Sequence, residues 1–244
     1  MNESAAAGEE ALARRAGGAM LYDASCLGQS DADLLDLDHW RRAGGVETAP
    51  GGRGTVAFVQ TPHGPRWVLR HYRRGGLMAR LVDDLYLWTG EERTRAFREW
   101  RLLRQLREWQ LPVPRPIAAG YRRHGMAYRA DLLTEELPVR RTLAQALQAG
   151  ALPAATWEAV GRCIGALHER GVQHADLNAN NLLLGERDAV YVLDFDRGRI
   201  RARGAWEHDV LARLQRSLRK VTTDLPSDRF GAAQWQALLA GGEH

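Results

Sequence analysis

Apolar residues in the first half of the chain alternate or recur in ways that predict a hairpin and a helix. Two apolar runs, Thr55–Gln60 and Arg66–Tyr72, flank a turn with the sequence Pro-His-Gly-Pro, and a glycine-rich stretch, Gly44–Gly54, precedes them. This order predicts a β-hairpin with a glycine loop at its start. Thr94–Trp109 carries Phe, Trp and Leu residues every three or four positions, which is typical of an amphipathic helix.

The second half predicts shorter strands and further helices. The expected elements are a strand at Tyr128–Leu137, a helix at Trp157–Glu169, a polar loop at His174–Asn181, a short hairpin at Leu182–Leu193 and a basic helix at Trp206–Val221. We place a boundary between two lobes near Glu135–Pro138, where the strand gives way to a polar linker. The expected division is a tail and lead-in segment at residues 1–43, an N-lobe at 44–137 and a C-lobe at 138–244.

The N-terminal residues and the cysteines restrict the class of protein. Met1–Met20 is rich in Ala, Gly and Glu and has no apolar segment of the signal-peptide kind, so we predict a disordered tail. No apolar stretch approaches the roughly eighteen residues that cross a bilayer. The two cysteines, Cys26 and Cys163, suggest neither a disulfide framework nor a metal cluster, and we expect a reducing compartment.

The charge of the chain is a mild basic bias, with a net charge of +4 and a pI of about 9.4. Such a bias suits a nucleotide, a phosphorylated acceptor or an anionic membrane surface, and it is too weak to indicate a nucleic acid partner. Almost all basic residues are Arg, and Lys220 is the only lysine. Any phosphate-binding site away from Lys220 is therefore expected to use Arg.

The segment from Leu167 to Asp196 holds the residues whose side chains are best suited to catalysis. Asp176 and Asn181 lie in the polar loop, and Asp194 ends an apolar strand eighteen positions after Asp176. Phosphoryl transfer to a hydroxyl needs a carboxylate that accepts the proton and oxygen ligands that hold Mg²⁺ against the triphosphate. Asp176 suits the first role, and Asn181 and Asp194 suit the second as hard oxygen donors.

These residues resemble two motifs of the protein-kinase superfamily. His174–Leu177 reads H-A-D-L, with Asn181 five positions after the aspartate, and is similar to H-R-D-L-x-x-x-N, while Asp194–Asp196 stands where D-F-G would. The resemblance implies an ATP-dependent phosphotransferase with a bilobal, protein-kinase-like α+β fold. Its N-lobe would hold an antiparallel sheet, its C-lobe would be mainly helical and shortened, and its cofactors would be ATP and Mg²⁺.

The same resemblance implies a nucleotide-binding role for four residues of the N-lobe. Gly52 and Gly54 stand in the place of a phosphate-binding glycine loop, in which backbone N–H groups approach phosphate. Arg70 occupies the place of the lysine in V-A-I-K, and Glu99 is its natural partner. We expect Arg70 to bind the ATP phosphates and to pair with Glu99.

Departures from the protein-kinase pattern bear on the acceptor. Asp196 replaces the glycine of D-F-G, Asn178 stands where protein kinases usually have a lysine, and no A-P-E motif follows. Only 48 residues follow Asp196 in the 244-residue chain, which is too few for a full C-lobe with an activation segment and a peptide groove. The acceptor is therefore expected not to be a protein.

Six phrases within the span from Gly44 to Val221 carry a narrower resemblance. They are Gly52–Thr55, Leu69–Gly76, Thr94–Glu99, Leu111–Pro116, His174–Asn181 and Asp194–Gly198. Together they resemble the lipopolysaccharide-core kinases, and within them those that phosphorylate 3-deoxy-D-manno-octulosonic acid (Kdo). This implies transfer of the γ-phosphoryl group of ATP to the 4-hydroxyl of Kdo on a lipid A precursor. It also implies a peripheral protein at the cytoplasmic face of a Gram-negative inner membrane.

Such an acceptor carries phosphates, a carboxylate and acyl chains. The acceptor-binding candidates are Arg73, Arg74, Arg197 and Arg199. Guanidinium groups pair bidentately with carboxylate and phosphate, which is why these residues suit the role. The Leu-rich connector Leu77–Trp88 ends in aromatic residue types that are favoured at membrane interfaces. The expected partners are therefore a Kdo–lipid A acceptor and the anionic surface of the inner membrane.

Two alternatives stay open. The protein could be a kinase of another acceptor, such as a core heptose or a small molecule like an aminoglycoside, or it could be a small atypical protein kinase. A nucleotide-binding pseudokinase that scaffolds a partner belongs to a different class. The missing lysine favours the pseudokinase, and the presence of Asp176, Asn181 and Asp194 argues against it.

Overall fold

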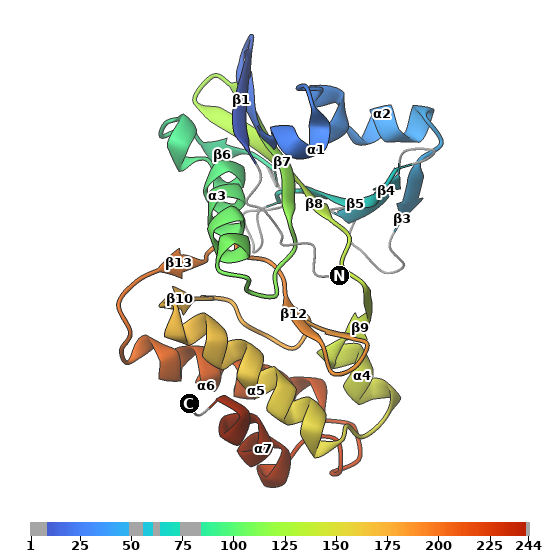
Figure 1. Ribbon diagram of the computed structural model, residues 1–244, viewed down its shortest axis with the longest axis vertical. Coiled ribbons are helices and arrows are strands. Elements are labelled where there is room, and N and C mark those ends of the chain that lie inside the picture. Colours follow the sequence, from blue (N-terminus) through green and yellow to red (C-terminus); the bar gives the residue numbers. More distant parts are fainter. Residues whose placement is uncertain (1–8, 49–55, 61–63, 74–83, 243–244) are drawn as a thin grey trace. The chain divides into compact units, whose positions relative to one another are not determined.

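The computed structural model describes residues 9–48, 56–60, 64–73 and 84–242. Three of the candidate site residues, Gly52, Gly54 and Arg74, lie outside the described residues, as does most of the apolar connector. The chain forms two compact units (Figure 1). The first comprises the described residues up to Glu108 together with Pro114–Glu136, and the second comprises Trp109–Val113 together with the described residues from Leu137 onward.

The first unit is built on an antiparallel sheet in which eight strands take part. The strands are β1 (Glu10–Arg15), β2 (Gly18–Asp23), β3 (Val46–Thr48), β4 (Val56–Gln60), β5 (Arg66–His71), β6 (Tyr86–Leu87), β7 (Pro116–His124) and β8 (Ala127–Glu135). Their order is β1-β2-β7-β8-β5-β4-β3, and β6 pairs with β8. These pairings are antiparallel, which confirms the predicted sheet of the N-lobe.

The predicted hairpin of the glycine-loop region is present as β4 and β5. Ala57 and Val59 of β4 lie opposite Leu69 and Trp67 of β5, and the four side chains are buried in the core of this unit. Alternate residues of a strand point to the same face of a sheet. Arg70 follows Leu69 directly and therefore points to the other face.

Helix α3 (Arg95–Glu108) confirms the helix predicted at Thr94–Trp109. Its buried apolar residues are Phe97, Trp100, Leu103 and Leu106. These side chains are at most 1% exposed, and the helix packs against β7 and β8. Full burial of one such side chain stabilises by about 1.5–3 kcal/mol, so together they fasten the helix to the sheet. Glu99 lies within this buried stretch, and a buried carboxylate needs partners.

The prediction that Met1–Met20 forms a disordered tail is wrong for the residues that the structure describes. β1 and β2 form a hairpin, and β2 extends the sheet by pairing with β7 from Gly18↔Arg122 to Tyr22↔Ala118. Three consecutive apolar residues of β2 are buried: Ala19, Met20 and Leu21. A local window of the sequence does not reveal this pairing, because the partner strand of β2 lies in the distant segment Pro116–His124.

The lead-in segment after β2 also belongs to the first unit. It forms α1 (Ala24–Leu27), the 3₁₀ helix η1 (Ala32–Leu35) and α2 (Leu37–Arg42). Trp40 of α2 is 2% exposed and packs in the core beside Trp67 of β5, with ring centroids 6.0 Å apart. The apolar and aromatic residues of this segment therefore complete the core on one side of the sheet.

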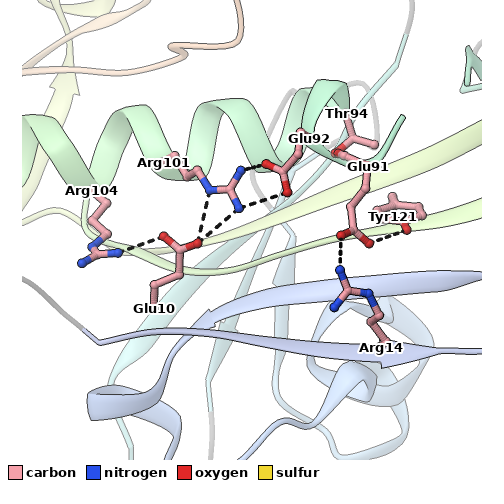
Figure 2. A network of polar contacts seen from close by, with 8 residues as sticks. All are labelled: Glu10, Arg14, Glu91, Glu92, Thr94, Arg101, Arg104 and Tyr121. Atoms are coloured by element: carbon pink, nitrogen blue, oxygen red, sulfur yellow. Dashed lines mark hydrogen bonds and ion pairs between the residues drawn. The ribbon is translucent and has the colours of Figure 1, made fainter. Parts of the chain in front are cut away.

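Ion pairs link the β1–β2 hairpin to the α3 region (Figure 2). Glu10 of β1 accepts from Arg101 at 3.2 Å and from Arg104 at 2.9 Å. Arg14 donates to Glu91 at 2.7 Å. Partly exposed pairs of this kind contribute about 1 kcal/mol or less each, so the buried apolar side chains supply most of the stability of this region.

The second unit is mainly helical, as predicted for the C-lobe. Its helices are α4 (Leu143–Ala149), α5 (Ala154–Glu169), α6 (Trp206–Val221) and α7 (Ala232–Gly242). One small sheet joins β12 (Val190–Val192), β11 (Leu182–Gly185) and β9 (Val139–Thr142), and another pairs β10 (Val172–Gln173) with β13 (Arg199–Ile200). Helices α5 and α6 and the β11–β12 hairpin confirm the predicted elements. Among the residues described, the chain has no helix with the length and apolar character that a membrane span needs.

Helices α5 and α7 approach each other so closely that glycine is required. A Cβ atom at Gly161 would lie 1.9 Å from the backbone oxygen of Leu238, and one at Gly241 would lie 2.2 Å from that of Glu158. A side chain at either position would therefore push the helices apart in a region that is already close-packed. This contact fixes the C-terminal helix against α5, which leads into β10 and the loop that carries Asp176.

Candidate active site

The loop between β10 and β11 holds Asp176 by its backbone. The side-chain amides of Asn178 and Asn181 both donate to the carbonyl oxygen of Asp176, at 2.8 and 3.2 Å. The carboxylate takes no part in these bonds, and its side chain is 42% exposed. The loop is thus fixed while the carboxylate remains accessible to a substrate.

His174 ties this loop to the segment before Asp194. Its Nε2 atom lies 2.8 Å from the carbonyl oxygen of Leu193, and its ring packs edge-on against Phe195 at 4.8 Å. A carbonyl oxygen can only accept, so Nε2 carries the proton. Burial lowers the pKa of His174, because a charged ring would lose its hydration. His174 is therefore a neutral link between the two segments that carry the candidate residues.

Asn181 and Asp194 lie at the same end of the β11–β12 hairpin. The backbone N–H of Leu193 donates to the carbonyl oxygen of Asn181 at 2.9 Å, and Asp194 is the next residue. The amide nitrogen of Asn181 is bonded to Asp176, so its side-chain oxygen is the atom available as a ligand. An amide oxygen and a carboxylate are hard donors, and this donor set fits Mg²⁺.

The backbone of Asp194 is left-handed, with a φ of 65°. Residues other than Gly, Asn and Asp rarely adopt this conformation, and such outliers cluster at functional sites. This conformation turns the chain away from the direction of the strand. The next side chain, Phe195, is buried, and its backbone carbonyl accepts from the N–H of Gly198 at 2.8 Å. Asp194 therefore begins a tight turn and does not continue the strand.

The structure adds Arg213, which sequence reasoning missed. Its Nη2 atom donates to Oδ1 of Asp176 from helix α6. One turn later, Ser217 accepts from the backbone N–H of Ala179 at 3.1 Å. The four-residue spacing of Arg213 and Ser217 was the available signal, since it places both on one helix face. That spacing does not reveal which loop the face contacts.

In the first unit, Arg70 and Glu99 form the ion pair that the sequence predicts. Glu99 is 2% exposed and Arg70 is 22% exposed. Tyr72 is a third member that the prediction missed. Its hydroxyl donates to Oε2 of Glu99 at 2.6 Å and accepts from Nη2 of Arg70 at 3.1 Å, and the guanidinium lies 4.7 Å from the centre of the tyrosine ring. The spacing of two residues along an extended chain, which puts Arg70 and Tyr72 on one face, was the signal.

The acceptor-binding candidates that the structure describes are exposed. Arg73 follows Tyr72 in the first unit, and Arg197 and Arg199 follow Asp194 in the second. Arg199 belongs to β13, which pairs with β10 just before the loop that carries Asp176. Their exposure to solvent is compatible with binding of the acceptor, and this role stays a prediction.

Known proteins resemble this chain over most of its length. The family described as "Lipopolysaccharide kinase (Kdo/WaaP) family" matches residues 38–241. A protein of Stenotrophomonas maltophilia (strain R551-3), named 3-deoxy-D-manno-octulosonic acid kinase, is 48% identical over 209 residues, covering 84% of this chain and 81% of that protein. A protein of the same name from Photobacterium profundum is 40% identical over 222 residues, covering 91% and 93%.

The matched residues include the Arg70–Glu99 pair of the first unit and the Asp176 loop of the second. A third relative, from Xanthomonas campestris pv. campestris (strain B100), has the same name and is 48% identical over 206 residues, covering 84% of this chain and 81% of that protein. The chain therefore belongs to the lipopolysaccharide kinase (Kdo/WaaP) family and is a phosphotransferase that acts on a hydroxyl group.

Proposed function

We propose that this protein transfers the γ-phosphoryl group of ATP to the 4-hydroxyl of Kdo on a lipid A precursor. The relatives named above are kinases of 3-deoxy-D-manno-octulosonic acid, and each covers more than four fifths of this chain. The observation that carries the proposal is that hydrogen bonds join Asn181 to Asp176 and to Leu193, the residue directly before Asp194. This arrangement supports a role for Asp176 as proton acceptor and for Asn181 and Asp194 as metal ligands.

Each residue has a part in the proposed reaction. Asp176 accepts the proton of the acceptor hydroxyl as that oxygen bonds to phosphorus. Asn181 and Asp194 would hold Mg²⁺, and the bound ion would supply positive charge to the transferring phosphoryl group. Arg70 binds the nucleotide phosphates, and its bonds to Glu99 and Tyr72 fix the direction of its guanidinium.

Arg70→Ala is expected to raise the KM for ATP and to lower kcat, because the triphosphate loses the group that holds it in line. A hydrogen bond to a charged group contributes about 1.5–3 kcal/mol, so kcat/KM for ATP should fall roughly 10- to 10²-fold. Arg70→Lys should recover only part of the loss, since an ammonium cannot reproduce the fork that reaches a carboxylate and a phosphate together. Steady-state kinetics at varied ATP concentration measure both constants.

Arg66 offers a matched control for this prediction, because it lies on the same strand. Its guanidinium pairs with Glu47 at 2.7 Å and with Glu136 at 2.9 Å, and its side chain is 41% exposed. Arg66→Ala should leave the KM for ATP unchanged. If Arg70→Ala also leaves it unchanged, Arg70 does not bind the nucleotide.

The acceptor is tested directly with purified protein, ATP and Mg²⁺. Three acceptors are compared: a lipid A precursor that carries Kdo, the same precursor without Kdo, and a core heptose. We expect phosphate transfer only to the first, with the new phosphate on the 4-oxygen by NMR of the product. Transfer to the heptose, or to the precursor without Kdo, would contradict the proposed acceptor.

We also propose that the protein works at the cytoplasmic face of the inner membrane, bound to its anionic surface. The basic run Arg197–Arg203 and helix α6, whose last turn carries Arg219 and Lys220, support this proposal. A basic residue near an anionic surface contributes about 1 kcal/mol to binding. Electrostatic attraction of this kind brings the enzyme to an acceptor that is itself a lipid.

Co-sedimentation with anionic vesicles is expected to fall as salt rises. The screening length is about 10 Å at 0.1 M salt and about 3 Å at 1 M, so exposed arginines lose most of their attraction over this range. Vesicles of neutral lipid serve as the control and should bind weakly at every salt concentration. Binding to anionic vesicles that is the same at low and high salt would rule out electrostatic docking.

A further inference from the structure

The guanidinium of Arg213 is bonded to the carboxylate that the proposed function makes the proton acceptor. The two side chains are 47% and 42% exposed, so water screens their attraction. An ion pair at this exposure adds little to stability, and its loss does not unfold a protein. Stability therefore does not account for the position of Arg213.

Helix α6 is held so that Arg213 faces the catalytic loop. Leu214 and Leu218 are fully buried and anchor the helix in the second unit. Ser217, four positions after Arg213, accepts from the backbone N–H of Ala179 in the loop itself. Two contacts on one helix face thus reach the same loop, and the guanidinium is directed to it by a fixed scaffold.

The reaction needs positive charge near the base. Negative charge is spread over the oxygens of the phosphoryl group in transit, and preorganised donors aimed at such charge are among the largest contributions to catalysis. Asn178, in the loop position that protein kinases usually give to lysine, is neutral, and its amide nitrogen is bonded to the carbonyl oxygen of Asp176. Arg213 brings a permanently charged group to the same loop from a different element.

Arg213 is also within reach of the reacting atoms. A hydroxyl that gives its proton to Asp176 lies about 2.6–3.2 Å from the carboxylate, and the phosphorus that it attacks lies about 3–3.5 Å further on. The guanidinium is already bonded to Oδ1 of that carboxylate. A guanidinium has five N–H donors, so one can stay on Oδ1 while another donates to an oxygen of the phosphoryl group.

We propose that Arg213 is a catalytic residue that orients Asp176 through Oδ1 and binds an oxygen of the phosphoryl group as it transfers. This rests on the proposed function, with Asp176 as the base. The acceptor oxygen forms a bond to the γ-phosphorus while the bond from that phosphorus to the bridging oxygen of ADP breaks. The hydroxyl proton passes to Asp176, and ADP leaves with the bonding electron pair. The guanidinium keeps its own proton throughout and stabilises the charge on the transferring oxygens.

The test compares Arg213→Gln, Arg213→Lys and Arg162→Gln with the wild-type protein. Gln and Lys are both good helix formers, so neither should disturb α6. Arg162 is the matched control: it lies on α5 and pairs with Glu158 at 3.8 Å, with side chains 51% and 46% exposed. We measure kcat, the KM for ATP, the KM for the Kdo–lipid A acceptor and the thermal midpoint of each protein.

We expect Arg213→Gln to lower kcat about 10²- to 10³-fold with little change in either KM, and Arg213→Lys to recover part of the loss because the charge is retained. Arg162→Gln should match the wild type, and the thermal midpoints should agree. If the wild type is active and Arg213→Gln has an unchanged kcat, the role of Arg213 is wrong while the proposed function stands. A raised acceptor KM with normal kcat would also overturn it, and would make Arg213 an acceptor-binding residue. A wild type that is inactive on the Kdo acceptor would overturn the proposed function and this inference with it.

Discussion

Asp176→Ala is expected to lower kcat by about 10² to 10⁴ while the protein stays folded, because a general base contributes that much to the rate. The structure explains why the fold should survive. Asn178 and Asn181 bond to the carbonyl oxygen of Asp176, and alanine keeps that oxygen. The substitution removes only a half-exposed carboxylate and its bond to Arg213. The measurement is kcat at saturating ATP and acceptor, with the thermal midpoint as the check on folding.

Asp228 provides a control of the same kind for this substitution. Its side chain is 62% exposed and pairs with Arg229 at 3.6 Å, so Asp228→Ala also removes an exposed carboxylate with an Arg partner. We expect that variant to keep the wild-type kcat. A folded Asp176→Ala protein with near-normal kcat would mean that another group accepts the proton.

Asp194→Asn is expected to lower kcat by roughly 10² or more, because the proposed metal site loses a negative charge. A bound divalent ion supplies several kcal/mol of transition-state stabilisation, and about 1.4 kcal/mol corresponds to a factor of ten. Asparagine is the right replacement here, since it tolerates the left-handed backbone of residue 194 and keeps an oxygen ligand. Raising the Mg²⁺ concentration should restore part of the rate, and kinetics over a range of Mg²⁺ concentrations measure this.

Asp188 is a control for this substitution, because its backbone has a similar left-handed conformation. Its φ is 59°, close to the 65° of Asp194, and it lies in the turn between β11 and β12. Asp188→Asn should leave both the rate and its Mg²⁺ dependence unchanged. If Asp194→Asn behaves like Asp188→Asn at saturating and at limiting Mg²⁺, the metal ligand lies elsewhere.

Much of the fold could be predicted because its signals are local in the sequence. The apolar stripe of α3 and the alternation in β4 and β5 are visible in windows of a few residues, and each matches the structure. The loop that carries Asp176 is likewise compact, since Asp176 and Asn181 are five positions apart and hydrogen-bonded to each other. Even the Arg70–Glu99 pair follows from the known order of strand and helix in kinases.

The contacts that were missed join residues far apart in the chain. Arg213 is 37 positions from Asp176, and Arg104 is 94 positions from Glu10, so no short window contains both partners. Helix α7 was missed for a different reason. Its residues are largely apolar without a clear period and end in two glycines, which are poor helix formers, so its helical state depends on packing against α5.

The pairing of β2 with β7 has a consequence for any shortened form of this protein. The family match begins at residue 38, after the β1–β2 hairpin, so a truncation guided by that match would remove the hairpin. β7 would then become a nine-residue edge strand, with Ala118 and Ala119 uncovered along it. An uncovered strand edge is a template on which other chains add strands. We therefore expect loss of the hairpin to lower the solubility of the protein before it affects catalysis.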